Sequence, residues 1–201
     1  MKDVARNPAT LVAHDPSWAV DASRHLADLH AALGGLGGVS KATFDHIGST
    51  SVPGLAAKPY IDLQIGIFPL PSHDALASRL GLLGYQQEFG SRADSPGVGS
   101  DTPRGTEVVA DEVWEKRLYV LPREGVILHI RRADSPWARH TVWFRDWLRA
   151  NPDALARYGA TKRELSKANE GKPDVDDYTR AKTAFFDEVQ AEFTQWARRR
   201  Q

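Results

Sequence analysis

Apolar side chains recur at helical spacing toward both ends of the chain. Asp15 and Pro16 begin the first predicted helix, with Asp15 as the N-cap, and Gly34 ends it. The apolar positions between them follow the helical repeat: Trp18, Ala22, Leu26, Leu29 and Leu33. A second helix begins at Ser72. Three more are predicted after residue 134: Ser135 to about Ala150, Asn151 to about Asn169, and about Asp176 to the arginines at 198–200.

Alternating apolar and polar positions mark strands in the middle of the chain. They cover residues 42–47, 60–67, 114–121 and 126–131, and the last two form a hairpin around residues 122–125. Strands between terminal helices predict an α+β fold: a small mixed sheet, helices packed on its apolar face, and a C-terminal helical segment. We expect an N-terminal tail at 1–14 and one domain at 15–201, with an α/β core (15–134) and C-terminal helices (135–201).

Three of these strands carry one apolar row and one row rich in polar groups. The polar rows are Tyr60, Asp62 and Gln64; Arg117 and Tyr119; and Ile127, His129 and Arg131. One interpretation is a sheet with a solvent-exposed face, which is common in antiparallel sheets. The other is the floor of a cleft where Asp62, Gln64, Arg117, Tyr119 and His129 converge. The pattern alone leaves both open.

Composition narrows the classes of protein that fit. Lysine and arginine number 26, aspartate and glutamate also 26, and cysteine is absent. A neutral balance argues against a nucleic-acid-binding protein and against a polybasic membrane binder, and the lack of cysteine excludes disulfides and thiol catalysis. With no apolar leader or membrane-spanning stretch, we expect a cytoplasmic protein. Residues 90–106 are almost wholly polar and predict a long mobile loop, of a length that is usually functional or disordered.

The segment from Asp45 to Asp62 holds the clearest chemistry. Gly48 and Ser49 form a turn between a strand and a short helical connector, where free backbone N–H groups bind anions. Thr50 and Ser51 add hydroxyl donors, and Lys58 adds a cation. Asp62 on the next strand is placed to hold a divalent cation against a bound phosphate. Most Gly-Ser turns, however, are simple connections.

The run HIGSTSVPGLAAKPYID at residues 46–62 closely resembles the signature of the GrpB family, also called UPF0157. The resemblance covers most of the chain and includes HDPSW (14–18), LHI (128–130), WFRDWLR (143–149), KREL (162–165) and YTRAK (178–182). It implies a nucleotidyltransferase fold of the polymerase-β type, in a family whose members are sometimes fused to dephospho-CoA kinase.

The superfamily pattern that this resemblance implies is matched only in part. Gly48, Ser49 and Asp62 stand at the expected positions, but Gln64 occupies the place of a second carboxylate and His129 that of a third. One carboxylate, one amide and one imidazole bind Mg²⁺ weakly. The protein therefore uses one metal ion, uses none, or binds a nucleotide-like ligand without transferring anything.

Other residues have both a functional and a structural interpretation. His46 either braces the turn or touches ligand, and Asp45 either supplements Asp62 at the metal or is an exposed charge. Arg145, Lys162 and Lys182 are candidate anion binders or surface groups. Tyr178 shares a helix face with Lys182. The spacing of Trp143, Phe144, Trp147 and Leu148 indicates core packing.

The leading hypothesis is a nucleotidyltransferase acting on a small molecule. Gly48, Ser49 and Lys58 would hold phosphate, and Asp62 would hold Mg²⁺. His129 and Arg117 would stabilise or deprotonate the acceptor. The alternatives are a non-catalytic module that binds a nucleotide or another anionic small molecule, and a different transfer or ligation chemistry on the same fold.

Overall fold

A five-stranded mixed sheet forms the centre of the computed structural model, which describes residues 9–103, 108–172 and 175–199. The strands are β1 (Thr43–Ile47), β2 (Ile61–Ile67), β3 (Gln86–Gln87), β4 (Lys116–Leu121) and β5 (Val126–Arg132), in the order β1-β2-β5-β4-β3. β2 and β5 are parallel and the other pairs antiparallel. The predicted α+β class, the mixed sheet and the hairpin are confirmed.

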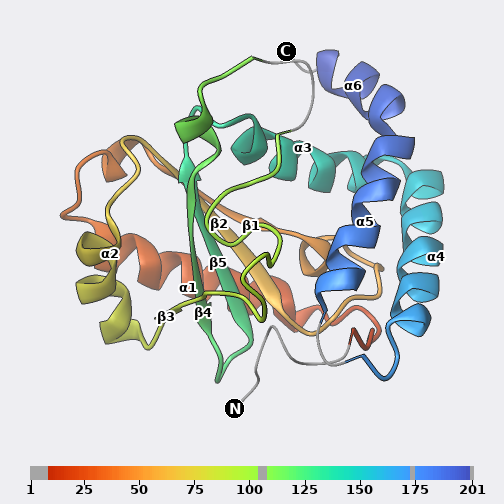
Figure 1. Ribbon diagram of the computed structural model, residues 1–201, viewed down its shortest axis with the longest axis horizontal. Coiled ribbons are helices and arrows are strands. Elements are labelled where there is room, and N and C mark those ends of the chain that lie inside the picture. The colour runs from red at the N-terminus through yellow and green to blue at the C-terminus, as the bar shows by residue number, and fades with distance from the viewer. Residues whose placement is uncertain (1–8, 104–107, 173–174, 200–201) are drawn as a thin grey trace.

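Within the part of the chain that the structure describes, six α-helices surround the sheet (Figure 1): α1 (Ser17–Leu33), α2 (His73–Leu80), α3 (Pro136–Ala150), α4 (Pro152–Ala168), α5 (Asp176–Glu188) and α6 (Gln190–Arg198). Ser72 caps α2, because its Oγ accepts from Ala75 N. α1 begins one residue later than predicted, with Pro16 at the N-cap position, although Asp15 Oδ1 still accepts from Ser17 N. The single last helix that we predicted is instead two, α5 and α6, which meet at the buried Val189. No glycine or proline marks this break, so the sequence carries no signal for it. No helix among the described residues is long and apolar enough to cross a membrane.

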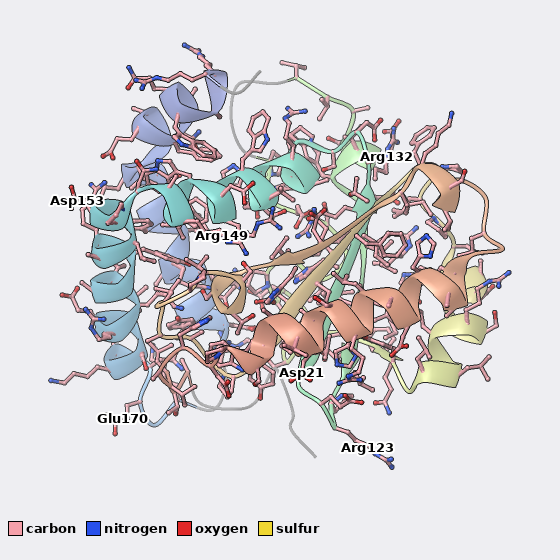
Figure 2. The ribbon with its side chains drawn as sticks, turned by 180° about the vertical axis from the view of Figure 1, so that it is seen from behind. Asp21, Arg123, Arg132, Arg149, Asp153 and Glu170 are labelled. Carbon is pink, nitrogen blue, oxygen red and sulfur yellow. The ribbon has the colours of Figure 1, made fainter. Side chains whose placement is uncertain are left out.

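α1 and α2 cover the apolar face of the sheet, as predicted, and α1 lies across it in Figure 2. The main core there joins Leu29 and Leu33 to Leu63, Ile65 and the apolar row of β5. A second apolar cluster holds the C-terminal helices together around Trp147, Phe185 and Phe193. The second cluster also includes Val52 and Leu55 from the turn after β1, so it anchors the C-terminal helices beside that turn.

The predicted N-terminal tail is partly packed against the domain. Val12 pairs with Ala57 through two backbone hydrogen bonds, and the buried Ala9 accepts a hydrogen bond from Ser166 Oγ. Residues 1–8 lie outside the described residues.

One predicted row of polar residues lies on the other side of the sheet from the rest. Tyr119 pairs with Leu128, and Arg117 with Ile130. Cross-strand partners project to the same face, so Arg117 and Tyr119 point toward α1 and α2 rather than into a cleft with His129. Tyr119 is 1% exposed within the main core. The expected convergence is therefore corrected for these two residues, and their neighbours Lys116 and Leu118 take the other face.

Candidate functional site

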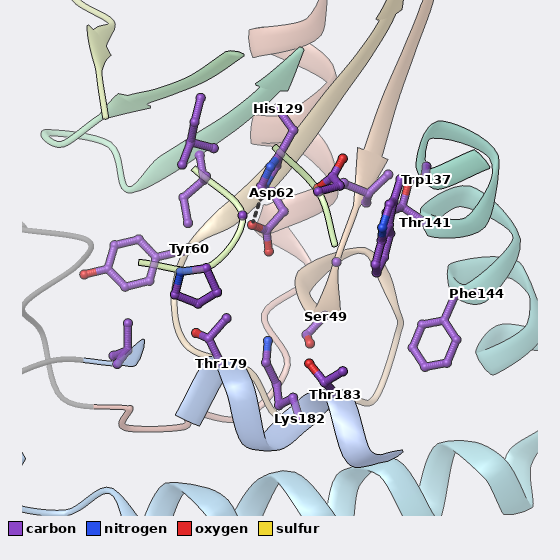
Figure 3. A pocket seen from close by; sticks show the side chains of 18 of the residues that line it. Ser49, Tyr60, Asp62, His129, Trp137, Thr141, Phe144, Thr179, Lys182 and Thr183 are labelled. Carbon is purple, nitrogen blue, oxygen red and sulfur yellow. Dashed lines mark hydrogen bonds and ion pairs between the residues drawn. The ribbon is translucent and has the colours of Figure 1, made fainter. Parts of the chain in front are cut away.

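A cavity of about 380 Å³ lies on the face of the sheet opposite α1, within the usual range for small-molecule sites. β2, β4 and β5 form one wall, and the turn after β1, the loop before β4, and helices α3, α4 and α5 form the others. Figure 3 shows Asp62 and His129 facing Ser49, Lys182 and Thr183 across this space, with Trp137, Thr141 and Phe144 of α3 to one side. Segments far apart in sequence thus meet at one site.

The turn after β1 has a conformation that requires glycine. Gly48 has φ +69°, and a Cβ there would overlap the Asp62 carboxylate, so the turn packs directly on that side chain. Ser49–Ser51 form a short 3₁₀ helix, and Ser51 Oγ donates to Gly48 O. Of the turn residues, Gly48, Ser49 and Val52 line the cavity.

The other predicted anion binders of this region brace the turn. His46 Nε2 lies 3.0 Å from Thr50 Oγ1, and both Thr50 and Ser51 are buried. Burial is the main cause that lowers the pKa of His46 to about 4. Arg145 lies at the cavity edge but donates to His46 O at 2.9 Å and pairs with Asp45 at 3.6 Å. Neither His46 nor Asp45 lines the cavity.

Asp62 and His129 face each other from the parallel strands β2 and β5. Asp62 Oδ1 and His129 Nε2 are 3.6 Å apart. Burial tends to raise the pKa of Asp62, but His129, Lys182 and Lys58 together lower it, so the carboxylate is ionised at neutral pH. Burial, Lys116 and Arg131 lower the pKa of His129 to about 4, so its imidazole is neutral. The pair combines a carboxylate base with a neutral imidazole.

Three lysines from three parts of the chain reach the cavity beside Asp62. Lys58 precedes β2, Lys162 lies on α4 and Lys182 on α5. The ammonium groups of Lys58 and Lys182 lie 5.4 and 5.3 Å from the ring centre of Tyr178, and Lys162 Nζ donates to Ala56 O. The structure thus brings together three of the sequence-predicted cations.

The surroundings of these three lysines destabilise the charged form of their side chains. Burial first, and repulsion among the three, lower the pKa of Lys58 to about 8 and that of Lys162 to about 7. Burial also lowers the pKa of Lys182, and Asp62 only partly opposes this. A bound anion would remove the repulsion, so the cluster is arranged to receive negative charge.

A buried ion network that the sequence did not reveal lies behind His129. Asp101, from the loop before β4, accepts hydrogen bonds from Arg131 Nε at 2.6 Å and Nη2 at 3.0 Å, and pairs with Lys116 at 3.2 Å. Lys116 and Arg131 hold the pKa of Asp101 well below its usual range against the effect of burial. Gln64 Oε1 accepts from Arg131 Nη1, and Gln64 Nε2 donates to Ala138 O, so this amide faces the network and α3.

The donor set does not fit Mg²⁺. In the described parts of the chain, no three His, Asp, Glu or Cys side chains gather as a metal site would require. Gln64 is engaged by Arg131, Asp45 by Arg145, and the cations Lys58 and Lys182 lie near Asp62. Mg²⁺ prefers several oxygen ligands in octahedral geometry. We therefore derive no step through a metal ion.

The loop before β4 covers one side of the cavity. Gly90, Ser95 and Val98 line it, and the hydroxyl groups of Ser91 and Ser95 donate to the buried Asp176 at the start of α5. The described part of the predicted loop at 90–106 therefore forms a wall of the site. Residues 104–107 lie outside the described residues. The mobility of the loop stays a prediction.

An aromatic wall closes the cavity on the side of α3. Trp137, His140, Phe144 and Phe186 line it. Phe144 also packs edge-on against Phe186, with ring centres 4.8 Å apart, in the second cluster. Trp147 and Leu148 are buried there, so the structure bears out the core packing predicted for these α3 residues. Phe144 also faces the cavity, in addition to packing.

Comparison with known proteins shows the family to which this chain belongs. The model of the GrpB protein family matches residues 8–192. The chain belongs to the GrpB family. A crystal structure of the conserved protein GrpB from Enterococcus faecalis has the same fold, with a TM-score of 0.69 and 25% identity over 94% of this chain and 99% of that one.

Relatives of this GrpB-family chain carry two kinds of name. A UPF0157 protein of Streptomyces coelicolor is 31% identical over 85% of this chain and 76% of its own length. A protein of Mycolicibacterium paratuberculosis named dephospho-CoA kinase is 33% identical over 98% of this chain but 48% of its own length. The chain thus spans about half the length of the relatives with that name, and the match covers one part of them.

Proposed function

We propose that this GrpB-family protein binds a nucleotide, an anionic small molecule whose phosphate groups are held by Lys58, Lys162 and Lys182. The observation that carries the proposal is the meeting of the buried Lys162 and the half-buried Lys58 and Lys182 beside Asp62 in one cavity. Ser49 and the backbone at Gly48 add donors on the same side. Buried cations are costly unless they are paired, and a bound phosphate would pair them.

Within this proposal, the Asp62–His129 pair acts on the bound molecule. The ionised Asp62 accepts a proton from an acceptor hydroxyl, and the lysines stabilise the negative charge that develops on phosphate oxygens. Trp137 and Phe144 offer a flat apolar wall for the rest of the ligand. Arg117 has no part in this arrangement, because it lies on the other face of the sheet.

Nucleotidyl transfer from a nucleoside triphosphate to a small acceptor is the specific reaction that we propose. The Gly48–Ser49 turn and Asp62 support it. Gln64 favours a second candidate, in which the same pocket binds the nucleotide without transfer, because this amide holds Arg131 where a second carboxylate was expected. The two candidates share the ligand and differ in pyrophosphate release.

Calorimetric titration with ATP, CTP, GTP and UTP, in EDTA and in Mg²⁺, tests the binding step. We expect binding of at least one nucleotide to persist in EDTA. Lys182→Met should weaken it at least tenfold, whereas Lys167→Met, which removes an exposed lysine on α4, should not change it. Absence of binding by all four nucleotides would refute the proposal. Pyrophosphate release across a panel of acceptors then separates transfer from binding alone.

A further inference from the structure

His129 has a buried partner on the side away from Asp62. Lys116 Nζ lies 3.3 Å from His129 Nδ1, and Lys116 and His129 stand on the adjacent strands β4 and β5. Lys116 is 2% exposed. The two ring nitrogens of His129 therefore have different neighbours: an ammonium at Nδ1 and the Asp62 carboxylate at Nε2.

The chemistry of these neighbours fixes the position of the imidazole proton. An ammonium group has only donors, so Nδ1 must accept from Lys116. A neutral imidazole carries one proton, which is then on Nε2 and directed at Asp62. Lys116 keeps its own proton at neutral pH, because burial lowers its pKa only to about 8 while Asp101 opposes the effect.

Asp101 and Arg131 keep the ammonium in place. Asp101 Oδ1 lies 3.2 Å from Lys116 Nζ, while the same carboxylate accepts two hydrogen bonds from Arg131. Arg131 in turn donates to Gln64, which is bonded to the backbone of α3. The charged groups that face His129 are thus Lys116 from β4, Arg131 from β5, Asp101 from the loop and Asp62 from β2.

We propose that Lys116, held by Asp101, is a positioning residue that fixes His129 in the tautomer with its proton on Nε2, so that His129 orients Asp62 and Asp62 is the proton acceptor of the site. The assignment of a chemical role to Asp62 rests on the proposed function. The tautomer itself does not. His129 then presents its Nε2 proton to the carboxylate, 3.6 Å away, rather than acting as a base.

Long-range ¹H–¹⁵N NMR correlation spectra of the ¹⁵N-histidine-labelled protein at neutral pH read the tautomer directly. His129→Gln assigns the signals by their loss. We expect Nε2 to be protonated and Nδ1 unprotonated in the unmodified protein. A protonated Nδ1 in the unmodified protein would overturn the proposal.

Variants at Lys116 test the cause. Lys116→Met should raise the population of the Nδ1-protonated form at least tenfold, whereas Lys116→Arg, which also only donates, should keep the proton on Nε2. Arg132→Met is a matched control that removes a cation of β5 paired with Asp134 outside the cavity, and it should leave the spectrum unchanged. An unchanged tautomer in Lys116→Met would refute the role of Lys116.

Nucleotide titration of the same samples separates this proposal from the proposed function. If no nucleotide binds but the tautomer follows Lys116 as expected, the proposed function fails and the positioning of His129 stands. If nucleotides bind and the tautomer is independent of Lys116, the positioning role fails alone.

Discussion

Gly48 determines how closely the turn after β1 approaches Asp62. The residue combines a positive φ with a position where a side chain would overlap the carboxylate. Gly54, six residues on, also has a positive φ of +79° but has open space around it. Gly54→Ala is therefore a control for a positive φ without contact with the site, whereas Gly48 combines such contact with a ψ of −169° that is essentially restricted to glycine.

We predict that Gly48→Ala destabilises the protein more than Gly54→Ala and also abolishes anion binding. A positive φ costs an alanine about 1–3 kcal/mol, and the backbone of Gly48, with ψ −169°, lies in a region that is essentially restricted to glycine. The forced displacement of Asp62 adds about 1–3 kcal/mol for Gly48→Ala alone. Urea denaturation measures the difference between the two variants, and calorimetry measures binding. Equal destabilisation with intact binding in both would show that the turn does not position Asp62.

At the level of elements, local patterns predict the helices and strands of this chain, but they do not predict which side chains of β4 point to the cavity. Alternation correctly separates Arg117 and Tyr119 from Lys116 and Leu118. It does not reveal which row faces the cavity, because that depends on the register of β4 with β5. Nothing in the sequence marks Lys116 as buried, because its partner Asp101, 3.2 Å away, lies fifteen residues from it along the chain.

The loop before β4 is tied to α5 through one buried carboxylate. Asp176 accepts hydrogen bonds from Ser91 Oγ at 3.2 Å and Ser95 Oγ at 2.7 Å, and lies 3.8 Å from Arg92 Nε. Asp94 and Arg180 also join the two elements, but the Asp94 side chain is 75% exposed. The buried contact should therefore dominate, since exposed ion pairs contribute little.

We predict that Asp176→Ala loosens this loop. Loss of the buried hydrogen bonds costs about 1–3 kcal/mol, which corresponds to an opening of the loop that is increased roughly fivefold to 150-fold. Limited trypsin digestion, followed by mass spectrometry of cleavage after Arg92, measures the opening. Asp94→Ala should change that cleavage rate less than about threefold, because it removes only an exposed ion pair. Equal rates in the two variants would contradict a tether at Asp176.

At the scale of the whole molecule, the candidate site is formed by residues from separate segments, and no single segment predicts it. The family resemblance indicates Lys58, Lys162 and Lys182 separately, and their meeting beside Asp62 depends on the packing of α4 and α5 through the second apolar cluster. The sequence could equally place each lysine on a solvated helix face. The overall balance of 26 basic and 26 acidic residues does not show the local excess of cations that line this cavity.

This excess makes the stability of the protein depend on pH. Lys162 has a pKa of about 7 in the folded protein, below its ordinary value of 10.5, because of burial and the neighbouring lysines. Between these values the unfolded chain binds more protons, so the free energy of unfolding rises with pH, by about 1.4 kcal/mol per pH unit for each such group. Below about pH 7 both states are protonated and this contribution is absent.

We predict that the free energy of unfolding rises between pH 7.5 and 9.5 by roughly 2–3 kcal/mol through Lys162 alone. Lys162→Met should remove this rise, and Lys167→Met should retain it, in urea denaturation at several pH values. Sulfate, whose charge is constant over this range, should stabilise the Lys167→Met protein most at the low-pH end, because it binds the protonated lysines. If the free energy of unfolding of Lys162→Met and of Lys167→Met rose equally with pH, Lys162 would not be the source of the pH dependence. The electrostatic basis for anion binding at this cavity would then be lost.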